Sequence, residues 1–323
     1  MLDLKDTLEI IIPSYNRCDT LAALLKTMLS SPVGNCIITV LDNNSTDGTG
    51  ECVQQLSWKH SNIRYIKNRY NLGLAGNICK AMTIPTKKYF WICFDDMKLD
   101  FGNWDSIEKG IRTDNDCILT TNYYNVQNTT DLKERAAIFL MLIYCFSGIY
   151  KTDLINDNVL LYALTDIYTL HPQMALISAV FNDKSRKIYI PDNTIASPTI
   201  NQEIQRGEKY TANRVDDFYH FRISSCPLSG FISALQALKD ENLKKTVIQL
   251  LFEEYNDFGP YLSKASIVSG RKKGRKEEYV NYIDEQYFLE SLYGIVNYKF
   301  KFLHNIIFLS AQVKVSLWSY LSA

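Results

Sequence analysis

The chain has 323 residues, of which 46% are hydrophobic and 22% charged, so it can bury a substantial core and is not disordered as a whole. Lysine plus arginine equals aspartate plus glutamate at 35 each, and this balance gives no electrostatic footprint for nucleic acid binding. The length suits one large α/β domain with a smaller addition.

The cysteines and the N-terminus indicate the compartment. The eight cysteines include no C-x-x-C spacing, and several lie inside apolar runs, which favours reduced, buried thiols. The first residues carry acids followed by a short aliphatic run, unlike a signal peptide or membrane anchor. No run of about 18 uncharged apolar residues occurs. We therefore expect a cytoplasmic protein, at most peripheral to the inner face of the plasma membrane.

Strand-like and helix-like patterns alternate over the first 120 residues. We predict strands at residues 8–12, 36–41, 63–67 and 89–94, and helices at residues 19–30, 49–56 and 73–83. Asp19 is the expected N-cap of the first of these helices. Because the strand runs are apolar on both faces, the pattern predicts an α/β fold with a mostly parallel sheet and helices on both sides.

The pattern is less regular beyond residue 120. Residues 138–150 are apolar, residues 171–181 indicate a buried helix, and residues 187–190 resemble one more strand. Helical spacing dominates from about residue 226. We expect a domain over residues 1–225 and a C-terminal helical region over residues 226–323.

Polar residues follow three of the predicted strands. Residues 13–17 follow the first strand, Asp42 follows the second, and Asp95 with Asp96 follow the fourth. Ligand sites of parallel α/β sheets form at the carboxyl ends of the strands, so we expect these residues to converge on one cleft.

The three aspartates suggest two kinds of contact. Asp42 could accept the N3–H of uracil or thymine or a ribose hydroxyl, although an aspartate here could also simply open a polar turn. The adjacent carboxylates of Asp95 and Asp96 repel each other unless a cation offsets their charge. A divalent Mg²⁺ or Mn²⁺ held with diphosphate oxygens is the natural partner, and the proximity of Asp42 favours this reading over a solvated turn.

Three stretches carry a specific resemblance. Residues 11–17, 40–49 and 68–77 (IIPSYNR, VLDNNSTDGT, NRYNLGLAGN) resemble the family-2 inverting glycosyltransferases, strongly over about residues 7–100. The resemblance implies a GT-A fold, a nucleotide-sugar donor and a divalent metal. Within the domain we expect a nucleotide-sugar half of about residues 1–120 and an acceptor half of about residues 121–225. The resemblance implies a donor pocket of Pro13, Ser14, Tyr15, Arg17, Asp42, Asn44, Asn71, Gly73 and Asp95, and a metal held by Asp95 and Asp96.

The sequence departs from the family pattern at two places. The acidic motif reads Phe94-Asp95-Asp96-Met97, and methionine cannot bind a hard cation, so the metal ligand is Asp95 or Asp96. The family's Glu-Asp pair has no clear counterpart, which leaves Asp166 and His171 as alternative general bases. The chain looks most similar to the abequosyltransferase-like branch of bacterial surface-polysaccharide enzymes. The absence of Gln-x-x-Arg-Trp favours transfer of one sugar at a time.

The expected partners follow from the resemblance. They are a UDP- or dTDP-sugar donor and a glycan or lipid-linked glycan acceptor. The balanced charge predicts no nucleic acid partner. The basic run 271–276 and the aromatic residues between 298 and 320 could lie on a membrane surface or form a helical lid, and both readings stay open. The rival for the whole chain is a catalytically inactive sugar- or partner-binding protein of the same fold. A dinucleotide-dependent oxidoreductase is disfavoured because G-x-G-x-x-G is absent.

Overall fold

The computed structural model of the chain describes residues 3–122, 125–127, 129–142, 147–165, 172–198, 235 and 237–254. Contacts group the chain into two compact units, Met1–Gly207 and Glu208–Ala323. The predicted boundary at residue 225 and the segments 271–276 and 298–320 lie outside the described residues and stay predictions. No helix of the described residues is long and apolar enough to cross a membrane.

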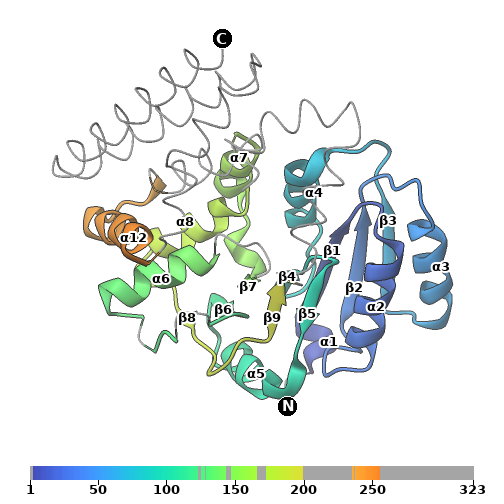
Figure 1. The fold of residues 1–323 in the computed structure, drawn as a ribbon, viewed down its shortest axis with the longest axis horizontal. Coiled ribbons are helices and arrows are strands. Elements are labelled where there is room, and N and C mark those ends of the chain that lie inside the picture. Colours follow the sequence, from blue (N-terminus) through green and yellow to red (C-terminus); the bar gives the residue numbers. More distant parts are fainter. Residues whose placement is uncertain are drawn as a thin grey trace, which may run out of the picture. The chain divides into compact units, whose positions relative to one another are not determined.

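Among the described residues, seven strands form one sheet in the order β3-β2-β1-β4-β7-β6-β8 (Figure 1). They are β1 (Leu8–Ser14), β2 (Ile37–Asp42), β3 (Ile63–Lys67), β4 (Tyr89–Ile92), β6 (Cys117–Leu119), β7 (Gly148–Lys151) and β8 (Ile188–Tyr189). A second, two-stranded sheet pairs β5 (Met97–Leu99) with β9 (Ala196–Pro198).

The direction of the strands decides which ends meet. Strands β1 to β4 are parallel, as predicted from their apolar runs. Strand β7 is antiparallel to both β4 and β6, so β6 runs in the same direction as β4. The carboxyl ends of β1, β2, β3, β4 and β6 therefore lie along one edge of the sheet.

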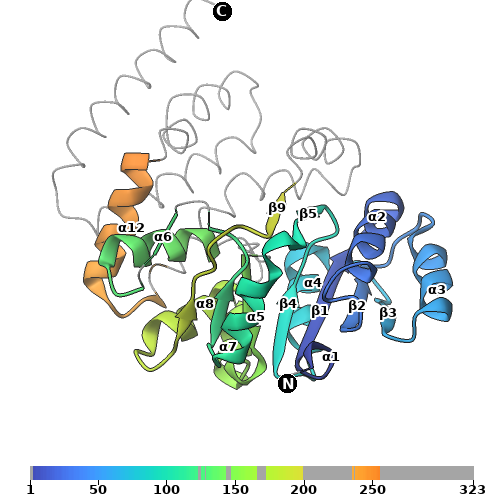
Figure 2. The same cartoon turned by 90° about the horizontal axis from the view of Figure 1, so that it is seen from below.

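Helices cover both faces of the sheet, as the alternating pattern predicted. Leu25 of α2 and Trp104 of α5 share one buried apolar cluster with Ile10 of β1 and Ile38 of β2. Helix α4 contacts β1 and lies beside α7 (Figure 1, Figure 2). The helices are α1 (Leu4–Thr7), α2 (Cys18–Leu29), α3 (Thr49–Lys59), α4 (Gly73–Met82), α5 (Trp104–Arg112), α6 (Leu132–Leu142), α7 (Asp157–Thr165), α8 (Met174–Asn182) and α12 (Glu241–Glu254), with short 3₁₀ turns η1 (Phe101–Asn103) and η3 (Thr152–Leu154).

The helix starts differ from two predictions. Asp19 is not the N-cap of α2, because the helix begins at Cys18 with Arg17 at the N-cap position. The N–H of Cys18 lies in the first turn, where it has no acceptor within the helix, and it donates to Asp47 Oδ2 (3.2 Å). A residue of the loop after β2 therefore supplies the acceptor at the start of α2. The helix predicted from residue 171 begins at Met174.

Candidate functional site

The strand ends converge as the sequence predicted. Ser14 at the end of β1 lies opposite Asp42 at the end of β2. The hydroxyl of Ser14 donates to Asp95 Oδ2 at 2.7 Å, and an Arg17 guanidinium nitrogen lies 3.6 Å from Asp96 Oδ2. Residues far apart in the sequence thus form one polar cluster at the carboxyl edge of the sheet.

Asp42 is fully buried and both of its carboxylate oxygens accept hydrogen bonds. The Ser45 N–H donates to Oδ1 at 2.8 Å, and the Tyr65 hydroxyl donates to Oδ2 at 2.5 Å. Burial, and then the hydrogen bond to Asp42, raise the pKa of Tyr65. Asp42 therefore opens the polar turn after β2, and contact with a base stays a prediction.

The loops after β1 and β2 hold each other in place. The Asn16 N–H donates to Ser45 Oγ, and the Thr46 N–H donates to Asn16 Oδ1, each at 2.9 Å. Asn16 (φ 51°) and Asn44 (φ 68°) are in the left-handed region, which asparagine tolerates better than most residues. The loop conformation at the edge is thus fixed by side chains within the loops.

Asp47 joins the starts of α2 and α3. Its carboxylate accepts the N–H groups of Thr49 (3.0 Å) and Cys18 (3.2 Å). Burial acts to raise the pKa of Asp47, but the hydrogen bond from the Thr49 hydroxyl (2.5 Å), together with those from the two N–H groups, outweighs it and holds the pKa below its ordinary value. The negative charge lies at two helix N-termini, where the helix dipole favours it.

An asparagine network places the turn before α4. The Asn43 amide donates to Asn71 Oδ1 (2.7 Å) and to the Gly73 carbonyl (3.1 Å), and the Gly73 N–H donates back to Asn71 Oδ1 (2.8 Å). The Asn68 amide donates to Asn43 (3.0 Å) and to Asn77 (2.9 Å). Gly73 has φ 70°, a conformation that glycine adopts without strain. The network fixes the 71–73 turn beside the end of β2.

Asp95 and Asp96 fit the donor set of a hard divalent cation. Both are buried, at 7% and 4% exposure, and they follow the carboxyl end of β4. Carboxylate oxygens are the ligands that Mg²⁺ prefers, and one or two are sufficient when substrate phosphates complete the shell. Among the residues that the structure describes, no group of three or more His, Cys, Asp or Glu side chains is placed to hold a metal ion.

The other predicted site residues differ in exposure and in whether they can be placed. Pro13 is buried within β1, whereas Tyr15 is 44% exposed. Asp166 and His171, the two candidate bases, lie outside the described residues.

The contribution of β3 to the site was not predicted from the sequence. Tyr65 and Lys67 lie two residues apart and therefore on one face of the strand. Tyr65 binds Asp42, and Lys67 Nζ donates to the Ser45 carbonyl at 2.9 Å. The signal in the sequence that could have indicated this role is the spacing of Tyr65 and Lys67, two residues apart at the end of a strand that follows the strand ending at Asp42.

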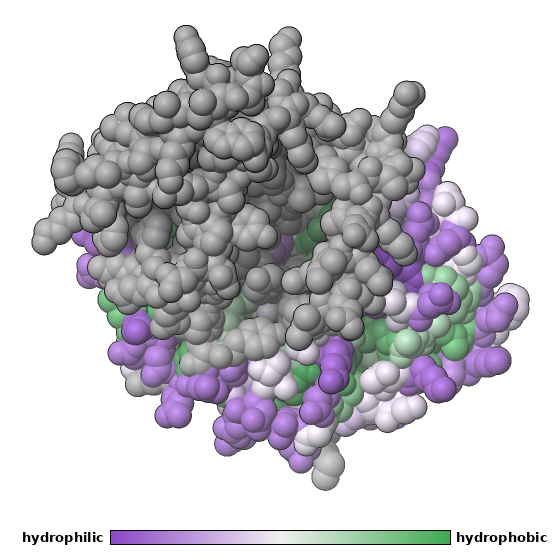
Figure 3. Space-filling view, in the orientation of Figure 1, coloured by the Kyte–Doolittle hydropathy of each residue, from purple (hydrophilic) through white to green (hydrophobic). Residues whose placement is uncertain are grey.

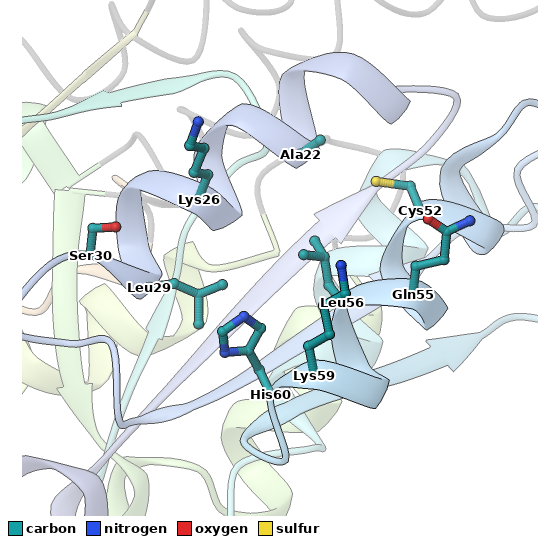
Figure 4. Close-up of a pocket in the computed structure, with 9 residues that line it drawn as sticks. All are labelled: Ala22, Lys26, Leu29, Ser30, Cys52, Gln55, Leu56, Lys59 and His60. Atoms are coloured by element: carbon teal, nitrogen blue, oxygen red, sulfur yellow. The ribbon is translucent and has the colours of Figure 1, made fainter.

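A groove of about 430 Å³ opens elsewhere, between α2 and α3 (Figure 4). The space-filling view has the orientation of Figure 1, in which α2 and α3 lie at the right. On that side, apolar surface lies among polar side chains (Figure 3). None of the site residues described above lines the groove, which is therefore separate from the candidate site. Its lining residues are Ala22, Lys26, Leu29, Ser30, Cys52, Gln55, Leu56, Lys59 and His60.

Known proteins share this sequence pattern and fold. An Escherichia coli UDP-Glc:alpha-D-GlcNAc-diphosphoundecaprenol beta-1,3-glucosyltransferase, WfaP, is 36% identical over 84 residues, or 26% of this chain. The match spans about a third (33%) of that relative's length. Residues 1–349 of S. aureus TarS, solved with UDP-GlcNAc, superpose with a TM-score of 0.58 at 16% identity, covering 88% of this chain and 81% of that one.

A second solved structure shares the fold. The mannosyltransferase PcManGT from Pyrobaculum calidifontis, in complex with GDP-Man and Mn²⁺, gives a TM-score of 0.51 at 12% identity over 88% of this chain and 85% of that one. The family described as Glycosyl transferase family 2 matches residues 9–181, which is more than half of the 323 residues. The chain therefore belongs to glycosyl transferase family 2, and its fold is the GT-A fold that the sequence predicted.

Proposed function

We propose that the protein is a non-processive, inverting glycosyltransferase that moves one sugar from a UDP- or dTDP-sugar to an acceptor hydroxyl. The observation that carries the proposal is the meeting of Ser14, Asp42 and the Asp95–Asp96 pair at one edge of the sheet. Along this edge Asp42 would contact the base, and the Asp95–Asp96 pair would hold the metal that binds the diphosphate.

The nucleotide would lie along the ends of β2 and β1. Asp42 has further lone pairs that could accept from a base N–H, with Tyr65 fixing its orientation. Tyr15, at 44% exposure, offers an aromatic face to the base. Arg17, close to Asp96, could pair with the diphosphate oxygens.

Asp95 and Asp96 would hold the divalent metal. When bound, Mg²⁺ or Mn²⁺ supplies positive charge that stabilises a departing nucleoside diphosphate. Ser14 would orient Asp95 through its 2.7 Å hydrogen bond, as supporting residues of metal sites do.

Inverting transfer needs a general base on the acceptor side. The acceptor oxygen would attack the anomeric carbon as the bond to the diphosphate oxygen breaks, and the base would take the acceptor's proton. We propose Asp166 or His171 for this role, because both belong to the half of the domain that is expected to form the acceptor side.

The relatives support the substrate class. The names of WfaP and of the TarS complex contain UDP-sugars, WfaP acts on a diphosphoundecaprenol-linked sugar, and PcManGT was solved with Mn²⁺. By analogy we propose a lipid-linked glycan acceptor, bacterial surface-polysaccharide synthesis, and a position at the inner face of the plasma membrane.

Metal-dependent donor binding tests the proposal. We expect at least one UDP- or dTDP-sugar from a full panel to bind in isothermal titration calorimetry with Mn²⁺, and EDTA to weaken that binding. Asp95→Ala or Asp96→Ala should weaken donor binding by about 10- to 100-fold or more, because replacing a residue that only supports a metal ligand already weakens metal binding by that factor. Asp192→Ala, an exposed aspartate, is the matched control. Failure of every nucleotide sugar to bind would sink the proposal.

A further inference from the structure

Two buried hydroxyls lie in the other half of the sheet, formed by β7 and β6. Thr121 and Ser147 are both fully buried. Within the described part of the chain, neither Thr121 Oγ1 nor Ser147 Oγ has a hydrogen-bond partner. A buried hydroxyl without a partner costs stability, so an arrangement with two of them requires a reason.

Both hydroxyls belong to the edge that carries the candidate site. Strand β6 runs parallel to β4, and Thr121 lies two residues beyond its carboxyl end. The Thr120 N–H donates to the Ser147 carbonyl at 2.9 Å, which places the two segments side by side. On β4, Trp91 pairs with Ile149, so Ser147 falls opposite Cys93, two residues before Asp95.

Backbone hydrogen bonds also connect the segment that carries Thr121 with the segment that follows the acidic pair. Strand β5 follows Asp96 directly and pairs with β9. The N–H groups of Ile195 (2.8 Å) and Ala196 (3.1 Å), at the start of β9, donate to the Thr120 carbonyl. The segment carrying Thr121 is therefore tied to the segment carrying Asp96.

The order of the strands gives the order of the groups along the edge. It runs from Asp42 on β2 through Ser14 on β1 and Asp95 after β4 to Ser147 at β7 and Thr121 at β6. With neighbouring strands about 4.8 Å apart, Ser147 lies roughly three spacings, or about 14 Å, from Asp42. A donor with its base at Asp42 and its diphosphate at Asp95 would extend its sugar toward β7 and β6.

We infer that the hydroxyls of Thr121 and Ser147 bind hydroxyl groups of the transferred sugar and so help to select it. This inference rests on the proposed function. A sugar presents several hydroxyls, and each can donate to or accept from a serine or threonine hydroxyl, supplying the missing partner. A sugar that lacks the matching hydroxyl would leave the protein group unpaired, which is a strong basis for discrimination.

Calorimetry with two ligands separates sugar contact from nucleotide contact. We would measure the Kd of UDP and of the UDP-sugar that wild type binds best, both with Mn²⁺. Thr121→Val and Ser147→Ala should each leave the Kd of UDP unchanged and raise that of the UDP-sugar about 3- to 10-fold, the effect of one lost hydrogen bond. Thr121→Ser keeps the hydroxyl and should keep the wild-type ratio.

The control and the thermal stability complete the test. Ser178→Ala removes a buried hydroxyl on α8 and should change neither affinity. Thr121→Val should keep or raise the melting temperature, because an apolar group of the same shape replaces an unpartnered hydroxyl.

Three outcomes would overturn the inference. One is an unchanged ratio of the two Kd values in both variants, and another is an equal loss for UDP and UDP-sugar. The third, a wild type that binds neither UDP-sugars nor dTDP-sugars to any measurable extent, would overturn the proposed function as well. Should Ser147→Ala fail to fold, the Thr121→Val and Thr121→Ser pair decides.

Discussion

At the edge of the sheet, the hydroxyl of Tyr65 orients the carboxylate of Asp42. The carboxylate is fully buried, so its oxygens need hydrogen-bond donors from within the protein. The Ser45 N–H and the Tyr65 hydroxyl are those donors. A nucleotide base would therefore meet a carboxylate that is already oriented.

Tyr65→Phe tests this coupling. The change removes one donor from a buried carboxylate and should lower the free energy of unfolding by about 1–3 kcal/mol, the cost of a lost hydrogen bond to a charged group. Urea denaturation measures it. Tyr70→Phe, on a 63% exposed ring, is the matched control. Equal stability of Tyr65→Phe and wild type would show that the hydroxyl contributes nothing to holding Asp42.

Strand β1 carries a buried acid at its amino end, although its pattern reads as apolar. Glu9 is fully buried, and its carboxylate accepts from the Thr39 hydroxyl and from both the N–H and the hydroxyl of Thr86, all at 3.0 Å. Arg64 lies 3.8 Å away. Glu9 thus connects β1 with β2, β3 and the loop before β4.

Glu9→Leu should destabilise the protein by about 2–4 kcal/mol, because it leaves several buried donors without an acceptor. Glu9→Gln keeps an acceptor oxygen and should cost less. Thermal and urea unfolding give both values. Glu108→Gln, which removes a charge from an ion pair on α5 with half-exposed Arg112, serves as the reference. A Glu9→Leu protein as stable as wild type would contradict this role.

The elements near the N-terminus were predictable because each is long and strongly patterned. The predicted strands at residues 8–12 and 63–67 fall on β1 and β3, and Asp42 and Asp95 mark where strands give way to loops. Strands β6 and β7 have only three and four residues, and their pairing depends on long-range contacts. Nothing local indicated that β7 would insert antiparallel between β4 and β6.

The site could likewise be predicted where single strands and their ends determine it. Side chains that follow strands, such as Ser14 and Asp95, could be assigned to one edge before their contact was known. Tyr65 was missed because its role depends on a neighbouring strand. Thr121 and Ser147 were missed because the order of the strands alone brings them to that edge.

Across the whole sheet, charged groups cluster at the end opposite the candidate site. Asp114 accepts from Lys88 and Lys151, which lower its pKa to about 2. Burial acts to raise the pKa of Asp116, but the Lys187 N–H and Arg186 outweigh it, so the pKa is lowered. The cluster joins the amino ends of β4, β6 and β8 with the carboxyl end of β7.

This cluster makes stability depend on pH in acid. Because the folded pKa of Asp116 is below its ordinary value of 3.8, its contribution is present above about pH 4 and is lost as pH falls through the folded pKa. Asp116→Asn should lower the free energy of unfolding by about 1–2 kcal/mol at pH 7. The interaction is not lost completely, because the amide oxygen can still accept a hydrogen bond. Urea unfolding from pH 7 to 2 should show this difference shrinking below pH 4. A difference constant across that range would contradict the assignment.

The most direct test of the account is transfer itself. The protein would be incubated with Mn²⁺, a panel of UDP- and dTDP-sugars and a diphosphate-linked polyprenyl sugar, and the lipid product analysed by mass spectrometry. The account predicts an increase of one sugar mass with one donor, no longer polymer, and strong loss of product with Asp95→Ala. A panel in which no donor yields product and none binds the protein would contradict it.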